Sequence, residues 1–245
     1  GDEAIDSATD NYELSLRYYT LGLAAAGSAY AYESMGSSMV VLAEAYAEVR
    51  GFPRRNAGED FYLLDKLAKV GALHRPACKP LLLRSRTSAR VHFGTGRKVS
   101  EIVASGGGLT TYHPRVFELL RSCLSALREV VRLRSQSDLP ALLGQTLDAG
   151  SVGAVSSALD ELQTFDALPG MFDASPDARV RDRRLLTWFD ALRTLRFIHL
   201  IEARASLGRM PILEALCAAP FCASIPTHLN GIQLKTAAFS AEQAL

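Results

Sequence analysis

The feature that most constrains the fold of this chain is the helical spacing of its apolar residues after Gly108. Apolar side chains recur every three or four residues between about 113 and 134, and the same spacing returns at about 152–167 and 177–206. The last stretch carries a band wide enough to pack on two sides, formed by Leu185, Trp188, Phe189, Leu192, Leu195, Ile198 and Ile201. Pro211 predicts a last short helix through Ala218.

The chain before the glycines Gly106 to Gly108 has a more mixed pattern. Helical spacing predicts a helix from about 10 to 26, with Thr9 and Asp10 as cap candidates and Gly27 at its end. A short helix is expected just before Gly51. Extended segments are predicted around the tyrosines at 30 and 32, at 39–42 and in "KPLLLRSRTSARVHF", followed by a glycine turn into a short helix.

These patterns predict a mostly α chain of the α+β class, with few short strands in the N-terminal part and a helical bundle-like C-terminal part. The glycine run is the predicted boundary, which divides the chain into domains at 1–105 and 109–245.

The composition is that of an ordinary globular protein. The 245 residues are 48% hydrophobic and 22% charged, with a net charge of +1, which suits one large domain or two small ones. The basic residues are balanced by acids almost one for one, so we expect no nucleic-acid partner.

The apolar runs and the cysteines of the sequence indicate the cellular location of the chain and whether cysteine binds a metal. No basic segment with a following apolar run resembles a secretory signal, and no apolar stretch reaches the roughly 18 residues of a spanning helix. The cysteines Cys78, Cys123, Cys217 and Cys222 are scattered, without metal-ligand spacing. We therefore expect a cytoplasmic chain with no transmembrane segment and no metal bound by cysteine.

An acid pair stands in "RRNAGEDFYLLDKLAKVG" at 54–71. The stretch predicts a helix from about 57 to 70 that stops at Gly71, with Asn56 as N-cap and Glu59 completing a capping box. By helical count Asp60 shares its face with Leu63, Leu64 and Leu67 and points inward, whereas Glu59 points outward. A buried carboxylate costs several kcal/mol unless it is paired or lines a wet cleft. The alternative is that both acids only complement the helix dipole.

The segment from Tyr12 through this helix resembles the second half of the catalytic domain of bacterial family 2 glycosyltransferases. In that family a small-residue strand leads to "GGFP" or a near variant, a short spacer and an acid pair at the start of a helix. This chain has "RGFPRRNAGED", with Arg50 where a glycine is common, and the similarity covers about 12–96.

The resemblance implies inverting sugar transfer of the hexosyltransferase type, from a nucleotide-sugar donor to a sugar or polyol acceptor, in a GT-A fold. Asp60 would be the general base that deprotonates the acceptor hydroxyl, which is work suited to a positioned carboxylate. Glu59 would orient the acceptor or brace the helix.

Members of this family carry a basic loop after the helix that helps to hold the donor diphosphate. Here Arg86 and Arg90, together with Gly94 and Gly96, are the candidates for phosphate contact, and Arg90 is the first choice. The alternative is a solvated turn. Two serines bordering the expected acceptor pocket, Ser37 and Ser38, are substrate-binding candidates, although "SMGSSM" also suits a tight turn.

One departure from the family is large. The strand-helix-strand half that binds the nucleotide, and its Asp-x-Asp motif for Mg²⁺ or Mn²⁺, have no counterpart in the sequence. The resemblance therefore implies an acceptor-side fragment of a longer enzyme, inactive alone, with nucleotide-sugar and divalent metal handled by the full-length protein. The alternative is a non-catalytic helical interaction or scaffold domain. Donor sugar, acceptor, processivity and oligomeric state stay open.

Overall fold

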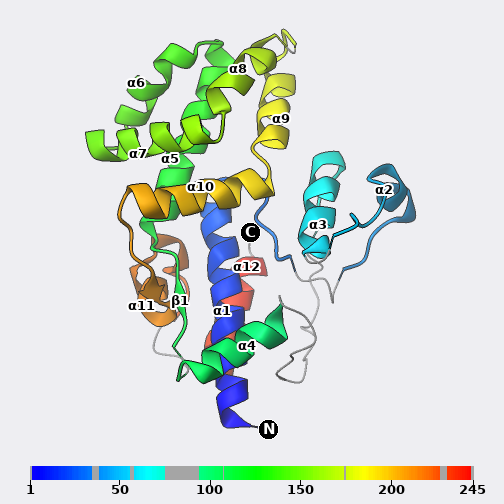
Figure 1. The fold of residues 1–245 in the computed structure, drawn as a ribbon, viewed down its shortest axis with the longest axis vertical. Coiled ribbons are helices and arrows are strands. Elements are labelled where there is room, and N and C mark those ends of the chain that lie inside the picture. Colours follow the sequence, from blue (N-terminus) through cyan, green and yellow to red (C-terminus); the bar gives the residue numbers. More distant parts are fainter. Residues whose placement is uncertain are drawn as a thin grey trace. The chain divides into compact units, whose positions relative to one another are not determined.

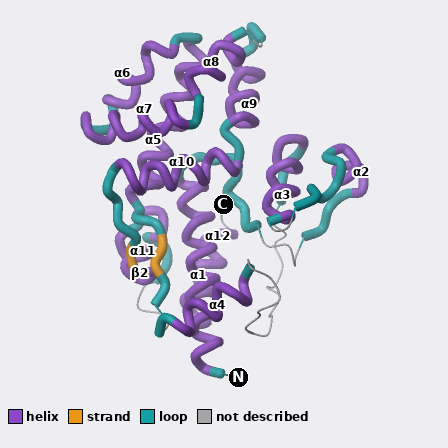
Figure 2. The backbone as a smooth tube through the Cα atoms, in the orientation of Figure 1, coloured by secondary structure: helices purple, strands orange, loops and turns teal. Residues whose placement is uncertain are grey.

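The computed structural model describes residues 2–34, 39–55, 58–74, 94–106, 108–173, 175–226 and 231–243. In this part the chain forms helices α1–α12, two 3₁₀ helices and two very short strands (Figures 1 and 2), which confirms the mostly helical prediction. Two compact units are found: unit 1 comprises 1–22, 31–111 and 209–245, and unit 2 comprises 23–30 and 112–208. The division at 105/109 into functional domains stays a prediction.

Helix α1 (Glu3–Ala25) begins earlier than predicted. Thr9 and Asp10 lie inside it, so neither is its cap, and the carboxylate of Asp2 instead accepts a hydrogen bond from the amide of Ala4 at 3.1 Å. The predicted end is confirmed at Gly27, which has a left-handed φ of 73°.

Unit 1 contains a small core between α1 and α4 (Thr95–Ala104). Ala8 of α1 packs with Val99 and Ile102 of α4, and Tyr12 covers this cluster. The short helix predicted after the glycine turn is thereby confirmed.

The two strands of unit 1 also join distant parts of the sequence. Strand β1 (Thr110–Thr111) pairs antiparallel with β2 (Met210–Pro211), and α11 (Ile212–Ala218) follows directly, as Pro211 predicts. Figure 2 shows the strands as a short orange pair. The 3₁₀ helix η3 (Pro220–Cys222) places Phe221 against Tyr18 of α1, with ring centroids 5.3 Å apart.

The C-terminal helix α12 (Gly231–Gln243), which apolar spacing does not predict, is held to α1 by charged side chains. Arg17 pairs with the buried Glu242 at 2.5 Å. Lys235 pairs with Asp10 at 2.6 Å and Glu13 at 3.3 Å. Burial lowers the pKa of Lys235, but these two carboxylates outweigh it, and the pKa is raised overall.

Unit 2 is a helical bundle around α5 (Arg115–Leu133), which confirms the helix predicted at 113–134. The apolar stripe of α5 is buried over its whole length, because α5 contacts all five of the α-helices that follow it in unit 2. These are α6 (Leu139–Gly144), α7 (Ala149–Glu161), α8 (Thr164–Phe172), α9 (Ala178–Trp188) and α10 (Ala191–Arg204), with the 3₁₀ helix η2 (Gln136–Asp138) between α5 and α6.

Two predicted helices of unit 2 are interrupted. The stretch 177–206 forms α9 and α10 rather than one helix, because Asp190 caps α10 by accepting a hydrogen bond from the amide of Arg193 at 3.0 Å. The stretch 152–167 is divided at Gln163, whose φ of 59° ends α7 before α8 starts. Apolar periodicity continues across both breaks and so conceals them.

The strands predicted in the N-terminal part are wrong wherever the structure describes them. Residues 30–32 and 39–42 have no regular secondary structure. The stretch "KPLLLRSRTSARVHF" falls at 79–93, outside the described residues.

Candidate functional site

A left-handed turn leads into the site. Helix α2 (Ala43–Glu48) ends in a Schellman motif. The amide of Arg50 donates a hydrogen bond to the carbonyl of Ala47 at 3.0 Å, and the amide of Gly51 donates one to the carbonyl of Tyr46 at 2.9 Å. Arg50 and Gly51 have φ of 60° and 62°. Arg50 thus occupies the position at which helices most often have glycine, and it is the position where the resemblance expects one.

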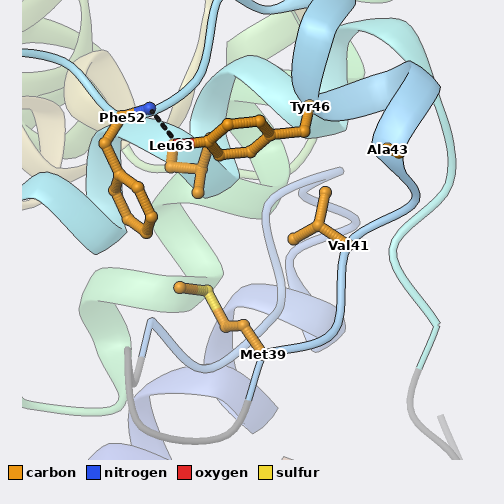
Figure 3. Close-up of a pocket in the computed structure, with 6 residues that line it drawn as sticks. All are labelled: Met39, Val41, Ala43, Tyr46, Phe52 and Leu63. Atoms are coloured by element: carbon orange, nitrogen blue, oxygen red, sulfur yellow. Dashed lines mark hydrogen bonds between the residues drawn. The ribbon is translucent and has the colours of Figure 1, made fainter.

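The turn is fixed by contacts on both sides. A side chain at Gly51 would bring its Cβ to 2.8 Å from the ring of Tyr46, which would have to shift, and the left-handed φ of 62° also favours glycine there. The amide of Phe52 donates to the Tyr46 hydroxyl at 3.4 Å, as Figure 3 shows, and Lys66 of the next helix donates to the carbonyl of Gly51 at 3.1 Å. The Gly-Phe-Pro segment is therefore tied to the helices before and after it.

Helix α3 (Glu59–Val70) carries the acid pair in its first turn. Its N-cap is Gly58, with a left-handed φ of 71° and no side-chain cap, so the capping box predicted for Asn56 and Glu59 is wrong. Asn56 itself lies outside the described residues. The predicted end at Gly71 is confirmed, since its amide donates a hydrogen bond to the carbonyl of Leu67 at 2.9 Å.

The two acids point as the helical count predicts. Asp60 is half-buried and Glu59 is exposed, while Leu63 and Leu67 on the inward face are buried. One oxygen of Asp60 accepts a hydrogen bond from the amide of Phe61 at 2.8 Å. The positive end of α3 favours a negative charge at this place. The catalytic role of either acid stays a prediction.

A second inward carboxylate was missed in the sequence reasoning. Asp65, also on α3, is only 6% exposed and is neutralised by Lys69 at 2.7 Å. The signal was present, because an aspartate four residues before a lysine on a helix is a common ion pair. Asp65 stabilises α3 through a buried ion pair, whereas Asp60 lies in the first turn of the helix.

Tyr12 connects the acid to α4. Burial raises the pKa of the Tyr12 hydroxyl, a hydrogen bond with the side chain of Thr95 lowers it in part, and the negative charge of Asp60 raises it further. Asp60 therefore lies within electrostatic reach of Tyr12, and Thr95 within hydrogen-bonding reach. The predicted base and the first residue of the helix after the predicted phosphate turn thus both interact with one tyrosine.

The phosphate candidates are described in part. Gly94 is the N-cap of α4 with a φ of 111°, and a Cβ placed on it would meet no atom within 4 Å. Gly96 lies in the first turn of the helix. Arg97 and Lys98, which follow, each pair with Glu101 at 3.0 Å. Four further candidates lie outside the described residues, namely Arg86, Arg90, Ser37 and Ser38.

An apolar cavity of about 390 Å³ lies beside this site (Figure 3). It is lined by Met39, Val41, Ala43, Tyr46, Phe52 and Leu63. Leu63 follows Asp60 by one helical turn on the same face of α3, about 5 Å along the helix axis. The sequence reasoning did not find this cavity, because its lining comes from segments on both sides of the left-handed turn.

Within the described residues, no three His, Cys, Asp or Glu side chains gather into a possible metal site. Cys123, Cys217 and Cys222 are free thiols, and Cys78 is not described. None of the described helices has the length and apolarity to cross a bilayer.

Comparison with known proteins finds no match among protein-family models, curated proteins or solved structures.

Proposed function

We propose that residues 12–96 are the acceptor side of an inverting glycosyltransferase, in which Asp60 is the general base. The observation that carries the proposal is the placement of Asp60. It is half-buried in the first turn of α3, a short spacer after the Arg-Gly-Phe-Pro segment with its two left-handed residues, and like Thr95 at the start of α4 it interacts with Tyr12.

The chemistry that we assign to Asp60 is one proton transfer. An acceptor hydroxyl attacks the anomeric carbon of the donor sugar and gives its proton to the carboxylate of Asp60. The bond between that carbon and the nucleoside diphosphate breaks, and the electron pair leaves with the diphosphate. Attack opposite the leaving group inverts the anomeric centre. The amide of Phe61, which donates to Asp60, orients the carboxylate for this step.

The left-handed turn is further support for the resemblance. The family pattern has glycine where this chain has Arg50, and a glycine preference is explained by the φ of 60° at that residue. Two successive left-handed residues also give a physical reason for the glycine-rich pattern that precedes the acid pair.

Binding of the nucleotide-sugar donor is assigned to residues other than Asp60 and Glu59. The described part offers no cluster for Mg²⁺ or Mn²⁺, so no step is assigned to a metal here. Gly94 and Gly96 at the start of α4 suit approach by a phosphate, because helix amides there favour an anion. We place nucleotide-sugar binding in the full-length protein and expect residues 1–245 to be inactive alone. The free thiols support a cytoplasmic location.

The test is Asp60→Asn in the full-length protein, assayed by release of nucleoside diphosphate. We expect kcat to fall by about 10²–10⁴-fold, with circular dichroism and donor affinity unchanged. Asp65→Asn is the matched control, since it removes the other inward carboxylate of α3 and is expected to lower stability while kcat is kept. Full turnover by the Asp60 variant would remove Asp60 from the role of base.

The second candidate is a non-catalytic helical interaction or scaffold domain. The observation that favours it is the cavity that reaches Leu63 of α3, whose lining within the described residues consists of apolar side chains and the ring of Tyr46 and carries no charge. Absence of any glycosyl transfer by the full-length protein, across nucleotide-sugar donors, would support this candidate over the first.

A further inference from the structure

Helix α12 lies along α1 in a parallel orientation (Figure 1). Near the start of α12, Lys235 pairs with Asp10 and Glu13 of α1 at 2.6 and 3.3 Å. Further along α12, Glu242 pairs with Arg17 at 2.5 Å. The contact therefore advances toward the C-terminus of both helices at once, and charged side chains stand at both ends of it.

The apolar part of this contact is small. Of the α12 side chains that the structure describes, those of 233–243, the buried apolar ones are Leu234 and Ala238. Phe239 is half-buried, and the guanidinium of Arg17 lies 4.9 Å from the centre of its ring. The apolar stripe of α5, by contrast, is buried throughout. Few buried apolar contacts are typical of elements that open locally while the rest of a domain stays folded.

Arg17 is shared by two carboxylates. Its Nη1 atom lies 2.5 Å from Oε2 of Glu242 and 3.4 Å from Oε1 of Glu33, which lies in the segment after α1. All three side chains are largely shielded from water, with exposed fractions of 12% for Arg17, 1% for Glu242 and 22% for Glu33. Two carboxylates that share one cation also repel each other, and the repulsion is stronger where water is excluded.

This arrangement lowers the free energy needed to lift α12 from α1. Removing one member of a buried ion pair normally leaves the other charge buried without compensation, which is strongly unfavourable. Here the departure of α12 takes Glu242 into water, while Arg17 keeps Glu33. It also separates the two carboxylates. Glu242 therefore holds the helix closed, and Glu33 compensates Arg17 when the helix is open.

We propose that α12 is a strap that opens and closes on α1 while the rest of unit 1 stays folded, with Arg17 paired to Glu242 in the closed form and to Glu33 in the open form. Opening uncovers the face of α1 on which Asp10, Glu13 and Arg17 lie. The proposal does not depend on the glycosyltransferase function.

The ion pairs of Lys235 make the opening sensitive to salt. Lys235 and its partners Asp10 and Glu13 are partly exposed, so mobile ions reach them. Salt screens such pairs, since the Debye length shortens from about 10 Å at 0.1 M to about 3 Å at 1 M. We therefore expect α12 to open more often at high ionic strength.

The first experiment measures hydrogen exchange in residues 1–245 by mass spectrometry at pH 7. We expect the amides of α12 to exchange at least about tenfold faster than those in the middle of α1. Low concentrations of urea should leave the α12 rate almost unchanged, because local opening exposes little surface. Exchange of both helices at one rate would mean that α12 leaves only on global unfolding, and would overturn the proposal.

Two variants are expected to act in opposite directions. Glu242→Gln should speed exchange in α12 by at least about tenfold, because the strap loses the charge that Arg17 holds. Glu33→Gln should slow it by about threefold or more, because the closed form loses a repulsion and the open form loses the partner of Arg17. Glu101→Gln is the matched control: it removes an exposed, ion-paired carboxylate on α4 of the same unit and should leave α12 unchanged.

The last experiment repeats the exchange in KCl from about 0.05 to about 1 M. Exchange in α12 should rise by about threefold or more in the wild type and by less in Lys235→Met, which lacks the pairs that salt screens.

Two further results would overturn the proposal. One is faster exchange of α12 in Glu33→Gln, which is the effect expected of a merely structural ion pair. The other is an equal salt response in the wild type and Lys235→Met. A general loss of stability speeds exchange, so a poorly folded variant cannot imitate the slower exchange expected of Glu33→Gln.

Discussion

The guanidinium of Arg181 in α9 donates a hydrogen bond from Nε to the carbonyl oxygen of Val131 in the last turn of α5, over 3.1 Å. The same group donates to the carbonyls of Ser175 and Pro176, both at 2.7 Å, and to that of Arg132 at 3.3 Å. Arg181 is only 4% exposed. A buried cation thus satisfies the end of the central helix of unit 2, where the helix dipole favours positive charge.

Arg181→Met should therefore destabilise the protein by about 3 kcal/mol or more, because it leaves several buried carbonyl groups without a donor. Arg181→Lys should recover only part of the loss, since one ammonium cannot reach all these oxygens. Urea unfolding followed by circular dichroism gives the free energy. Arg183→Met, on the exposed side of α9, is the control, and an equal loss in both variants would contradict the role of Arg181.

Arg50→Gly should stabilise the protein by up to about 1 kcal/mol, because it removes a left-handed arginine at the end of α2. Part of the gain is offset by the added freedom of glycine in the unfolded chain. Arg54→Gly lies in the exposed segment that follows and serves as the control, because we expect it to bring no increase in stability. Thermal unfolding distinguishes them, and a lower Tm for Arg50→Gly would count against the Schellman geometry.

Gly51→Ala is expected to destabilise the protein, in contrast to Arg50→Gly. The new Cβ meets the Tyr46 ring at 2.8 Å in a backbone with φ of 62°, so we expect a loss of about 2 kcal/mol or more. In the Gly51→Ala background, Tyr46→Ala should remove the part of this loss that comes from the steric clash. A double-mutant cycle would then show strong coupling between the two positions, and additive losses would mean that the ring does not limit position 51.

Thiol labelling at pH 8 should find one fast-reacting cysteine among the three described, Cys217, because it is exposed. Burial raises the pKa of Cys123, and burial raises that of Cys222 to about 12, so neither forms the reactive thiolate at this pH. With Cys78→Ser, Cys217→Ser should abolish fast labelling. Rapid modification of the remaining two in native protein would show that their surroundings are open.

The buried thiol also predicts a pH dependence of stability. Because the folded-state pKa of Cys222 is raised from 9.0 to about 12, its neutral form is favoured in the fold. This contribution is complete below pH 9 and is lost as pH rises from about 9 toward 12, since the unfolded chain ionises first. Cys222→Ala should flatten the decline of unfolding free energy over that range, and an unchanged slope would contradict it.

The helices could be predicted from the sequence where apolar spacing and a terminal signal agree. Gly27, Gly71 and Pro211 mark the ends that the structure has. The breaks at Gln163 and Asp190 were missed because apolar spacing runs through them. The orientation of Asp60 followed from helical counting alone, since an amphipathic helix has one way to bury its leucines.

The sequence by itself determined that this chain is mostly helical, which residues of each helix face inward, and that an acid pair begins α3. Only the tertiary structure decided what surrounds those residues. The proximity of Tyr12, Asp60 and Thr95, the cavity beside Leu63 and the burial of Arg181 each join segments far apart in the chain. The same reason explains residues 39–42. Side-chain pattern specifies a strand's faces, but a strand forms only when a neighbour supplies its hydrogen bonds.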